Sequence, residues 1–239
     1  MEQIINKHER IALQFSGGKD SLALLNLMEP YWDRLTVYWT NPGDPFPETV
    51  ALMEQIRAIV PHFVVIEGDV HGSIQNFGLP SDLVPADSTP IGLAARRGGT
   101  RIQDRYSCCM RSLMLPMHER MKADGVTLVI RGQKNSDVLR APIKSGTVED
   151  GIEYLFPLED WDDARVMAYL AEKGIPVPRF YDYMNANPDC MHCSAYWEEG
   201  RGKYLREFYP ESYQDYLDRL GAISDATAAP IANFNVEIG

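Results

Sequence analysis

The stretch IALQFSGGKDS, residues 11–21, decides the fold predicted for this chain. Its apolar first half, residues 11–15, predicts a short buried strand, and the glycine pair that follows ends the strand. Leucine and methionine at helical spacing predict a helix over residues 21–28. The stretch therefore predicts a strand, a glycine turn and a helix in succession.

The composition of the turn is that of an anion-binding loop, which reads Ser16-Gly17-Gly18-Lys19-Asp20-Ser21. Adjacent glycines let the backbone take positive φ and approach a ligand closely, and the free N–H groups at a helix start favour phosphate. Lys19 adds a positive charge, the serines add hydroxyl donors, and Asp20 can hold the loop or a Mg²⁺ ion. A plain turn is the alternative for a glycine pair alone, but the whole hexapeptide after a strand favours a phosphate site.

Strand and helix patterns alternate on the C-terminal side of this loop. Residues 35–39, 63–67 and 126–131 predict strands, and residues 48–60 and 110–122 predict helices. Such alternation is typical of a parallel sheet, which binds ligands at the carboxyl ends of its strands. Thr40 and Gly132 follow two of these strands, so we expect them at the same edge as the glycine loop.

The last third of the chain is predicted to be mainly helical, over residues 161–173 and 203–220, with a loose or partner-docked segment at 225–239. We therefore predict two domains. Residues 1–159 form a nucleotide-binding α/β domain, and residues 160–239 form a helical extension that carries the second cysteine pair.

Composition excludes several classes of protein. The chain has 239 residues, of which 45% are hydrophobic and 24% charged, and its net charge is −11, which argues against a general binder of nucleic acids or anionic membranes. No apolar run approaches the ~18 residues that span a bilayer, and the first residues are polar, so we expect a cytoplasmic protein. Residues 96–144 reverse the balance, with 11 basic against 4 acidic side chains, which indicates either a local anion site or a solvated basic face.

Two tight pairs account for all four cysteines, Cys108-Cys109 and Cys190-x-x-Cys193. A reducing compartment disfavours disulfides, and buried inert thiols do not explain the pairing. Four thiolates can bind Zn²⁺ or an iron–sulfur cluster, although adjacent cysteines are unusual in zinc ribbons.

Four motifs in order carry a family resemblance over about residues 8–200. The SGGKDS loop resembles the signature of the PP-loop ATP pyrophosphatases, and it lacks Walker A spacing. Residues 46–49 (FPET), Gly132-Gln133-Lys134 leading to Arg140, and residues 157–161 (PLEDW) are similar to segments of the phosphoadenylylsulfate and adenylylsulfate reductase family. The resemblance implies a PP-loop α/β fold, a parallel sheet with helices on both faces, and a site for ATP with Mg²⁺.

The resemblance also implies roles for single residues. Lys19, Asp20 and Lys134 would be catalytic, and the adenine nucleotide would be bound by Ser16, Gly17, Gly18, Lys19, Asp20, Ser21, Thr40, Gly132 and Arg140. Cys-Cys followed by C-x-x-C is similar to the adenylylsulfate-reductase branch, which implies a 4Fe–4S cluster held by Cys108, Cys109, Cys190 and Cys193.

The sequence departs from the reductases in three places. No cysteine follows Cys193, where the reductases have a separate attacking thiol, and Ser112 and Leu113 stand where they have an Arg-Lys pair. The glycine loop is intact, whereas theirs is eroded. All three departures favour an enzyme that adenylylates an acceptor with ATP, releases pyrophosphate and transfers sulfur with the help of the cluster.

The partners expected of such an enzyme are a sulfur or electron donor protein and an acceptor that is a nucleic acid or a small phosphorylated metabolite, with no membrane. Two alternatives stay open at this point. One is a sulfonucleotide reductase that uses an external thiol, and the other is a non-catalytic nucleotide-binding module with a structural metal site.

Overall fold

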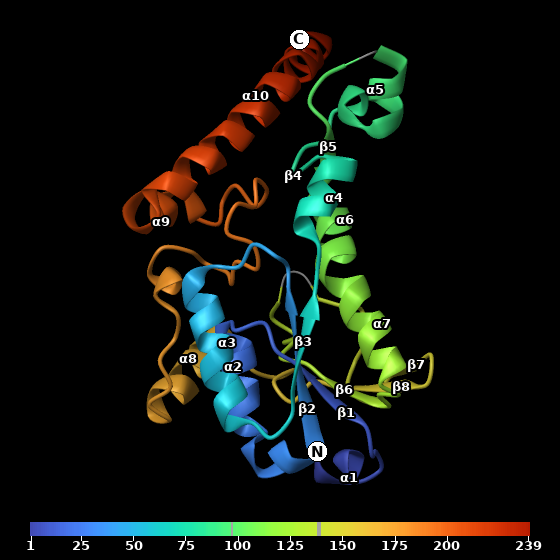
Figure 1. Cartoon of the computed structure of the whole chain (residues 1–239), viewed down its shortest axis with the longest axis vertical. Helices are drawn as coiled ribbons and strands as arrows, with labels where there is room; N and C mark the ends of the chain where they lie inside the picture. The colour runs from blue at the N-terminus through green and yellow to red at the C-terminus, as the bar shows by residue number, and fades with distance from the viewer. Residues whose placement is uncertain (97, 138–139) are drawn as a thin grey trace. The chain divides into compact units, whose positions relative to one another are not determined.

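The strand predicted at residues 11–15 is β1 (Ile11–Gln14), which lies in the middle of a six-stranded sheet in the computed structural model (Figure 1). The strand order is β3-β2-β1-β6-β8-β7. The other strands are β2 (Leu35–Asn41), β3 (Phe63–Glu67), β6 (Leu128–Ile130), β7 (Val148–Glu149) and β8 (Ile152–Leu155). All neighbours pair in parallel except β7, which pairs antiparallel with β8 at the edge.

Side chains of β1 alternate between two apolar clusters, as the period of a strand requires. Ile11 and Leu13 belong to a cluster with residues of helices α2 (Lys19–Leu27), α3 (Pro47–Ile59) and α8 (Asp163–Glu172). Ala12 belongs to a cluster with Met121 of helix α7 (Leu115–Ala123). Helices therefore cover both faces of the sheet (Figure 1). The predicted α/β class with a mostly parallel sheet is confirmed.

The structure describes residues 1–96, 98–137 and 140–239, which form two units that we treat separately. Unit 1 contains Met1–Asn41, Phe46–Glu67 and Pro116–Tyr181, and it includes the six-stranded sheet. Unit 2 contains Pro42–Pro45, Gly68–Leu115 and Asp182–Gly239. The division predicted at residues 159 and 160 stays a prediction, and the two units are interleaved along the sequence.

Unit 1 surrounds its sheet with helices that mostly match the predicted positions. They are α1 (Glu2–Ile5), α2 (Lys19–Leu27), α3 (Pro47–Ile59), α7 (Leu115–Ala123, from its second residue onward) and α8 (Asp163–Glu172). Two 3₁₀ helices, Glu29–Arg34 and Arg179–Asp182, complete the list. The sequence prediction missed strand β8, whose apolar side chains are interrupted by Glu153 and form no continuous apolar run.

Unit 2 combines a two-stranded parallel sheet with helices. Its elements are α4 (Val70–Phe77), β4 (Leu79–Ser81), a 3₁₀ turn (Ala86–Ser88), α5 (Pro90–Arg96), β5 (Ile102–Asp104), α6 (Arg105–Cys109), a π-helical turn (Met110–Met114), α9 (Arg201–Phe208) and α10 (Pro210–Ile238). No helix in the described ranges has both the length and the apolar character needed to cross a bilayer.

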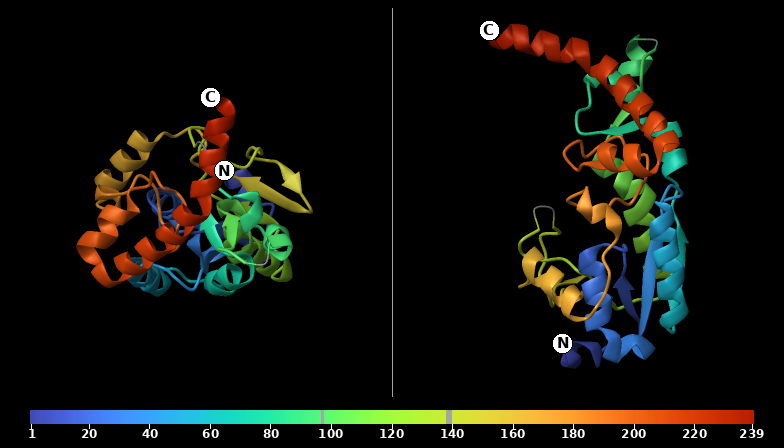
Figure 2. Two further views of the ribbon diagram at one scale, coloured as in Figure 1. Left: turned by 90° about the horizontal axis from the view of Figure 1, so that it is seen from above. Right: turned by 90° about the vertical axis from the view of Figure 1, so that its left-hand side faces the viewer.

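The C-terminal prediction needs two corrections. The single helix expected over residues 203–220 is two helices, because Pro210 lacks an N–H donor and begins α10 as its first residue. The segment at residues 225–239, expected to be loose or partner-docked, is helical as far as Ile238. Pro230 lies inside α10, which bends along its length, as helices with an internal proline do (Figure 2).

Candidate functional site

The glycine loop connects β1 to α2 in unit 1, as the sequence predicts. Gly17 has a φ of +81°, and a Cβ atom there would lie 2.9 Å from Met53 Cε, so the position requires glycine. Gly18 is the N-cap of α2 and provides no side-chain cap. The serines stabilise the turn, because the Ser21 hydroxyl donates to the Gly18 carbonyl at 2.9 Å and the Gly18 N–H donates to Ser16 Oγ at 3.4 Å.

Two lysines and three aspartates gather beside this loop. We call Lys19, Asp20, Lys134, Asp137 and Asp163 the lysine–aspartate cluster. Lys134 Nζ lies 2.7 Å from Asp20 Oδ1, 2.8 Å from Asp137 Oδ1 and 3.3 Å from Asp163 Oδ1. Lys19 Nζ lies 3.0 Å from Asp20 Oδ2 and 3.0 Å from Asp163 Oδ1. The structure therefore brings together Lys19, Asp20 and Lys134, the three predicted catalytic residues.

The strand order explains why these residues meet. The chain turns in opposite directions from β1 and from its neighbour β6, and ligands bind at such a switch point in parallel sheets. Gly132 follows β6, and a Cβ atom on it would lie 3.2 Å from the backbone of Asp20, so glycine allows the two segments to approach closely. This approach places Lys134 next to the start of α2.

Lys134 is a buried cation, with a side chain that is 1% exposed. Burial alone would lower the pKa of Lys134, but hydrogen bonds to Asp137 and Asp20 and their charges raise it above its usual range. Its backbone N–H also donates to Asp137 Oδ2 at 2.8 Å. The lysine is therefore charged and held at both its backbone and its ammonium.

Two further groups at the loop were not predicted from the sequence. The hydroxyl of Tyr181 accepts the backbone N–H of Lys19 at 2.9 Å, which is one of the donors that a phosphate would use. Asp163 is the first residue of α8, after the N-cap Asp162. Although partial burial acts in the opposite direction, the hydrogen bond and charge of Lys19 and the charge of Lys134 lower the pKa of Asp163.

The remaining predicted nucleotide-binding residues have other surroundings. Thr40 is buried near the carboxyl end of β2. Arg140 is exposed and donates to the backbone carbonyl of Asn135 at 2.6 Å. Their assignment to the nucleotide stays a prediction.

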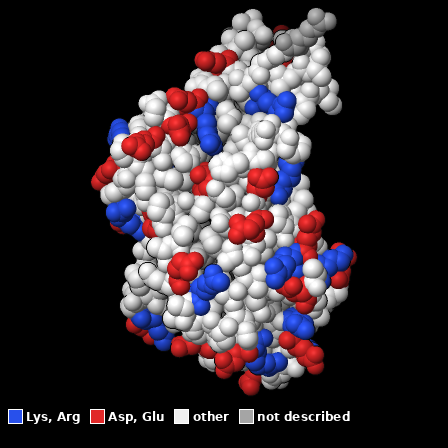
Figure 3. All heavy atoms as spheres, viewed as in Figure 1, with Lys and Arg blue, Asp and Glu red and all other residues white. Residues whose placement is uncertain are grey.

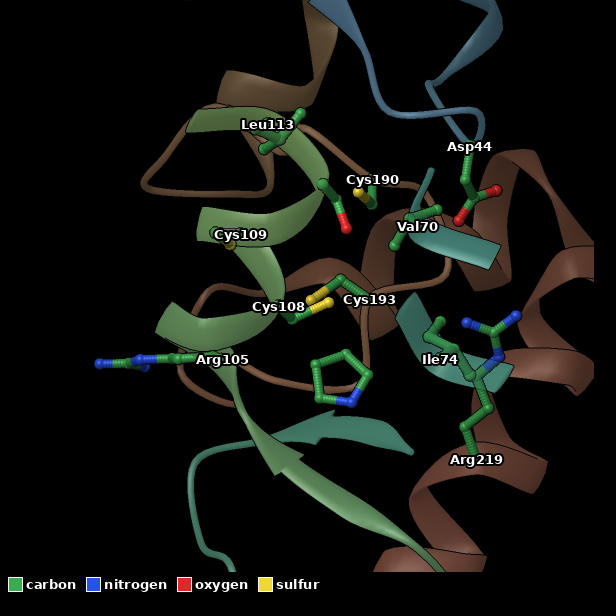
Figure 4. A pocket seen from close by; sticks show the side chains of 12 residues that line it. Asp44, Val70, Ile74, Arg105, Cys108, Cys109, Leu113, Cys190, Cys193 and Arg219 are labelled. Atoms are coloured by element: carbon green, nitrogen blue, oxygen red, sulfur yellow. The ribbon is translucent and has the colours of Figure 1, made fainter. Parts of the chain in front are cut away.

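All four cysteines line one pocket in unit 2 (Figure 4). Cys108 and Cys109 end helix α6, whose N-cap Asp104 accepts the N–H of Ser107 at 2.8 Å. Cys190 and Cys193 belong to the segment before α9. Apolar and charged side chains complete the lining, the charged ones being Asp44, Arg105 and Arg219.

The thiols of this cysteine pocket influence one another. Burial raises the pKa of Cys109 to about 12, with contributions from Asp189, Cys193 and Cys108. Burial also raises the pKa of Cys108, Cys190 and Cys193, and the charge of Cys193 adds to the shift at Cys190. As free thiols all four are protonated at neutral pH, so binding of a metal centre would release protons.

The loop between Cys190 and Cys193 is held by three charged side chains. Asp44 accepts the backbone N–H of His192 at 2.9 Å and its Nδ1–H at 2.8 Å. Arg219 donates to the His192 carbonyl at 2.8 Å, and the buried Arg201 donates to the Cys190 and Met191 carbonyls. Arg201 also pairs with buried Glu199. These braces fix the loop backbone without using the thiols.

The cysteine pocket offers four thiol groups as donors. Within residues 1–96, 98–137 and 140–239, no group of three or more His, Cys, Asp or Glu side chains is arranged to hold a metal ion. The cysteines nevertheless line the same pocket, and thiolate is the ligand of both zinc and iron–sulfur centres.

The basic segment predicted at residues 96–144 is divided between the two units. Several of its side chains have protein partners, since Arg105 pairs with Asp82, Arg111 donates to Gln103 and Arg120 pairs with Asp124. Arg97 lies outside the described residues. On the face drawn in Figure 3, basic and acidic side chains are interspersed.

The fold and the glycine loop together define an α/β protein of the PP-loop class. A family model described as the phosphoadenosine phosphosulfate reductase domain matches residues 10–196. The chain therefore belongs to the phosphoadenosine phosphosulfate reductase family.

Known proteins agree with this assignment. A phosphoadenosine 5'-phosphosulfate reductase from Gloeobacter violaceus is 23% identical over 195 residues, which are 78% of this chain and 73% of that protein. An uncharacterized protein from Methanocaldococcus jannaschii is 24% identical over 228 residues, 92% of this chain, and the chain spans 49% of its length. The crystal structure of a phosphoadenylyl-sulfate reductase from Candida auris in complex with phosphate has a TM-score of 0.53 at 18% identity, covering 80% of this chain and 82% of that one. This structural likeness shows the fold.

Proposed function

We propose that the chain is an enzyme that binds ATP at the glycine loop of unit 1 and adenylylates an oxygen of an acceptor, with release of pyrophosphate, in a sulfur-transfer reaction. The observation that carries the proposal is the convergence of Lys19 and Lys134 on Asp20 beside an intact SGGKDS loop. Two ammonium groups next to a helix N-terminus suit a chain of phosphates.

The chemistry follows from where negative charge develops. An acceptor oxygen attacks the α-phosphorus of ATP, the bond from that phosphorus to the bridging oxygen breaks, and pyrophosphate leaves with the electron pair. Lys19 and Lys134 would stabilise the charge that grows on the leaving group, because preorganised cations act most strongly in a partly buried site. The loop N–H groups would orient the phosphates.

Mg²⁺ would enter with the nucleotide, because magnesium in such sites is held by one or two carboxylates and the substrate phosphates. Asp20 is the protein carboxylate that we assign to it. Both oxygens of Asp20 are hydrogen-bonded to lysine ammoniums, so the phosphates would supply most of its ligands.

Cys108, Cys109, Cys190 and Cys193 would hold a 4Fe–4S cluster in unit 2. When bound, the cluster would supply electron transfer or a site for sulfur. The sulfur or electron donor would be a partner protein, and the acceptor a nucleic acid or a small phosphorylated metabolite.

The family match favours a second candidate, a sulfonucleotide reductase that takes its thiol from another protein. The residues of this chain give it less support, because every cysteine of the printed sequence lines the pocket of unit 2 and is buried enough for its pKa to rise. A thiol that attacks a sulfonucleotide must be accessible and ionised.

Product analysis separates the candidates. The protein is purified without oxygen, reconstituted with iron and sulfide, and given Mg·ATP with fractionated small RNAs and, separately, with a metabolite extract. We expect release of pyrophosphate that falls at least about tenfold in Lys19→Ala and Asp20→Ala. Sulfite formed from phosphoadenylylsulfate with a reduced thiol protein would support the reductase instead, and ATP binding without any product would support a non-catalytic module.

A further inference from the structure

Asp163 lies where a phosphate oxygen of the ligand would be expected. One oxygen atom, Asp163 Oδ1, lies 3.0 Å from Lys19 Nζ and 3.3 Å from Lys134 Nζ. A single anionic oxygen that bridges two ammonium groups reproduces the way in which lysines bind phosphate.

Asp163 differs from the other two aspartates of the cluster in its exposure to solvent. The side chains of Asp20 and Asp137 are 28% and 29% exposed, whereas that of Asp163 is 67% exposed. Asp20 uses both of its oxygens on lysines, and Asp137 also accepts the Lys134 backbone N–H. Asp163 is therefore the carboxylate that water can solvate most readily when it leaves the lysines.

The negative charge of Asp163 opposes the binding of an incoming anion. The lysine–aspartate cluster contains two lysines and three aspartates, so its formal charge is 2 − 3 = −1. A bare phosphate chain must displace Asp163 from the lysines and then remain near its negative charge. A phosphate chain that carries Mg²⁺ brings a cation that offsets that charge.

We infer that Asp163 is a specificity-determining residue, which competes with phosphate oxygens for Lys19 and Lys134 and so favours phosphate chains that carry a divalent cation over metal-free anions. The inference rests on the proposed function, because it concerns the same nucleotide site. Asp163 would thus be a negatively charged specificity residue in a site whose other ligand-binding side chains are the two lysines.

Isothermal titration calorimetry on the full chain tests the inference with two ligands, metal-free inorganic pyrophosphate in EDTA and Mg·ATP. Asp163→Asn keeps the shape of the side chain and removes its charge, and Asp163→Ala removes the competing oxygen as well. Glu172→Gln is the matched control, because it removes one exposed carboxylate from the same helix.

We expect both Asp163 variants to bind metal-free pyrophosphate at least about tenfold more tightly than the unmodified chain, and Mg·ATP less than about threefold more tightly. Glu172→Gln should bind both ligands as the unmodified chain does. Unchanged pyrophosphate binding, or an equal gain for both ligands, would overturn the inference.

Weaker Mg·ATP binding in Asp163→Asn would also overturn it, because Asp163 would then hold the metal. A different result would contradict the proposed function. If no form of the chain binds Mg·ATP while the Asp163 variants gain pyrophosphate binding, the competition of Asp163 for the lysines is supported and the nucleotide assignment is wrong.

Discussion

The lysine–aspartate cluster of unit 1 and the cysteine pocket of unit 2 differ in the charge state of their ionisable groups. In unit 1, buried Lys134 is charged, and protein carboxylates within 2.7–3.3 Å neutralise it. In unit 2, one buried thiol and three half-buried thiols are neutral, because burial raises the pKa of each. The first site carries its charges before a ligand arrives, whereas the second would become charged when the proposed metal centre replaced the thiol protons. The two sites should therefore respond differently to the loss of one residue.

The largest effect is expected in the cysteine pocket. Cys193→Ser should reduce iron from about four atoms per chain to near zero after anaerobic reconstitution, because an all-cysteine cluster needs each thiolate. Lys134→Ala should keep its iron, and Cys193→Ser should keep its ATP affinity. Iron analysis with visible absorbance measures the first property, and calorimetry the second. Retention of four irons by Cys193→Ser would show that this residue is not a ligand.

Loss of the buried cation should destabilise unit 1. Lys134→Ala leaves Asp20 and Asp137 without their shared partner, which we expect to lower the free energy of unfolding by about 3–5 kcal/mol. The control is Lys122→Ala, which removes an exposed lysine from α7 and should change stability by less than about 0.5 kcal/mol. Chemical denaturation measures both variants. Equal stability of the two would mean that the ion pairs of Lys134 contribute nothing to folding.

The glycine loop should be sensitive to a single methyl group. Gly17→Ala forces alanine into a φ of +81° and against Met53, which we expect to cost about 1–2 kcal/mol and to weaken ATP binding. Gly221→Ala is the control, because a Cβ atom there meets open space in helix α10. That change should stabilise the chain by up to about 1 kcal/mol. A Gly17→Ala chain as stable as the unmodified one would mean that the loop takes another conformation.

The smallest effects compare one helix cap in each unit. Asp162 caps α8 and Asp104 caps α6, and each accepts a backbone N–H at 2.8 Å. Replacing either by alanine should cost about 1 kcal/mol. Only Asp104→Ala should accelerate loss of iron to a chelator, because α6 carries Cys108 and Cys109. If Asp162→Ala loses iron equally fast, the cluster depends on the stability of the whole chain.

The residues that could be predicted from the sequence lie in short motifs. The glycine loop and Lys134 are recognisable because each follows a strand pattern. The cysteines are recognisable by their spacing in two tight pairs. The sheet class followed from alternating apolar runs and helical patterns, whereas strand β8 was missed because Glu153 interrupts its apolar side chains.

The residues that could not be predicted act across long sequence separations. Tyr181 reaches the backbone of Lys19 from 162 residues away, and Asp44 reaches His192 from 148. Asp163 has the sequence pattern of an ordinary acidic residue at a helix start, and only folding brings it to the two lysines. The last segment was predicted to be loose or partner-docked because it contains Ala, Asn and Pro230, yet it is helical as far as Ile238. The helical propensity of its other residues is sufficient despite the proline.

We propose that unit 1 binds ATP in preference to a sulfonucleotide. Calorimetric titration of the anaerobically purified chain with Mg·ATP and, separately, with phosphoadenylylsulfate tests it directly. We predict that Mg·ATP binds at least about tenfold more tightly, and that Lys134→Ala removes this preference. Tighter binding of phosphoadenylylsulfate by the unmodified chain would contradict this proposal and favour the reductase alternative.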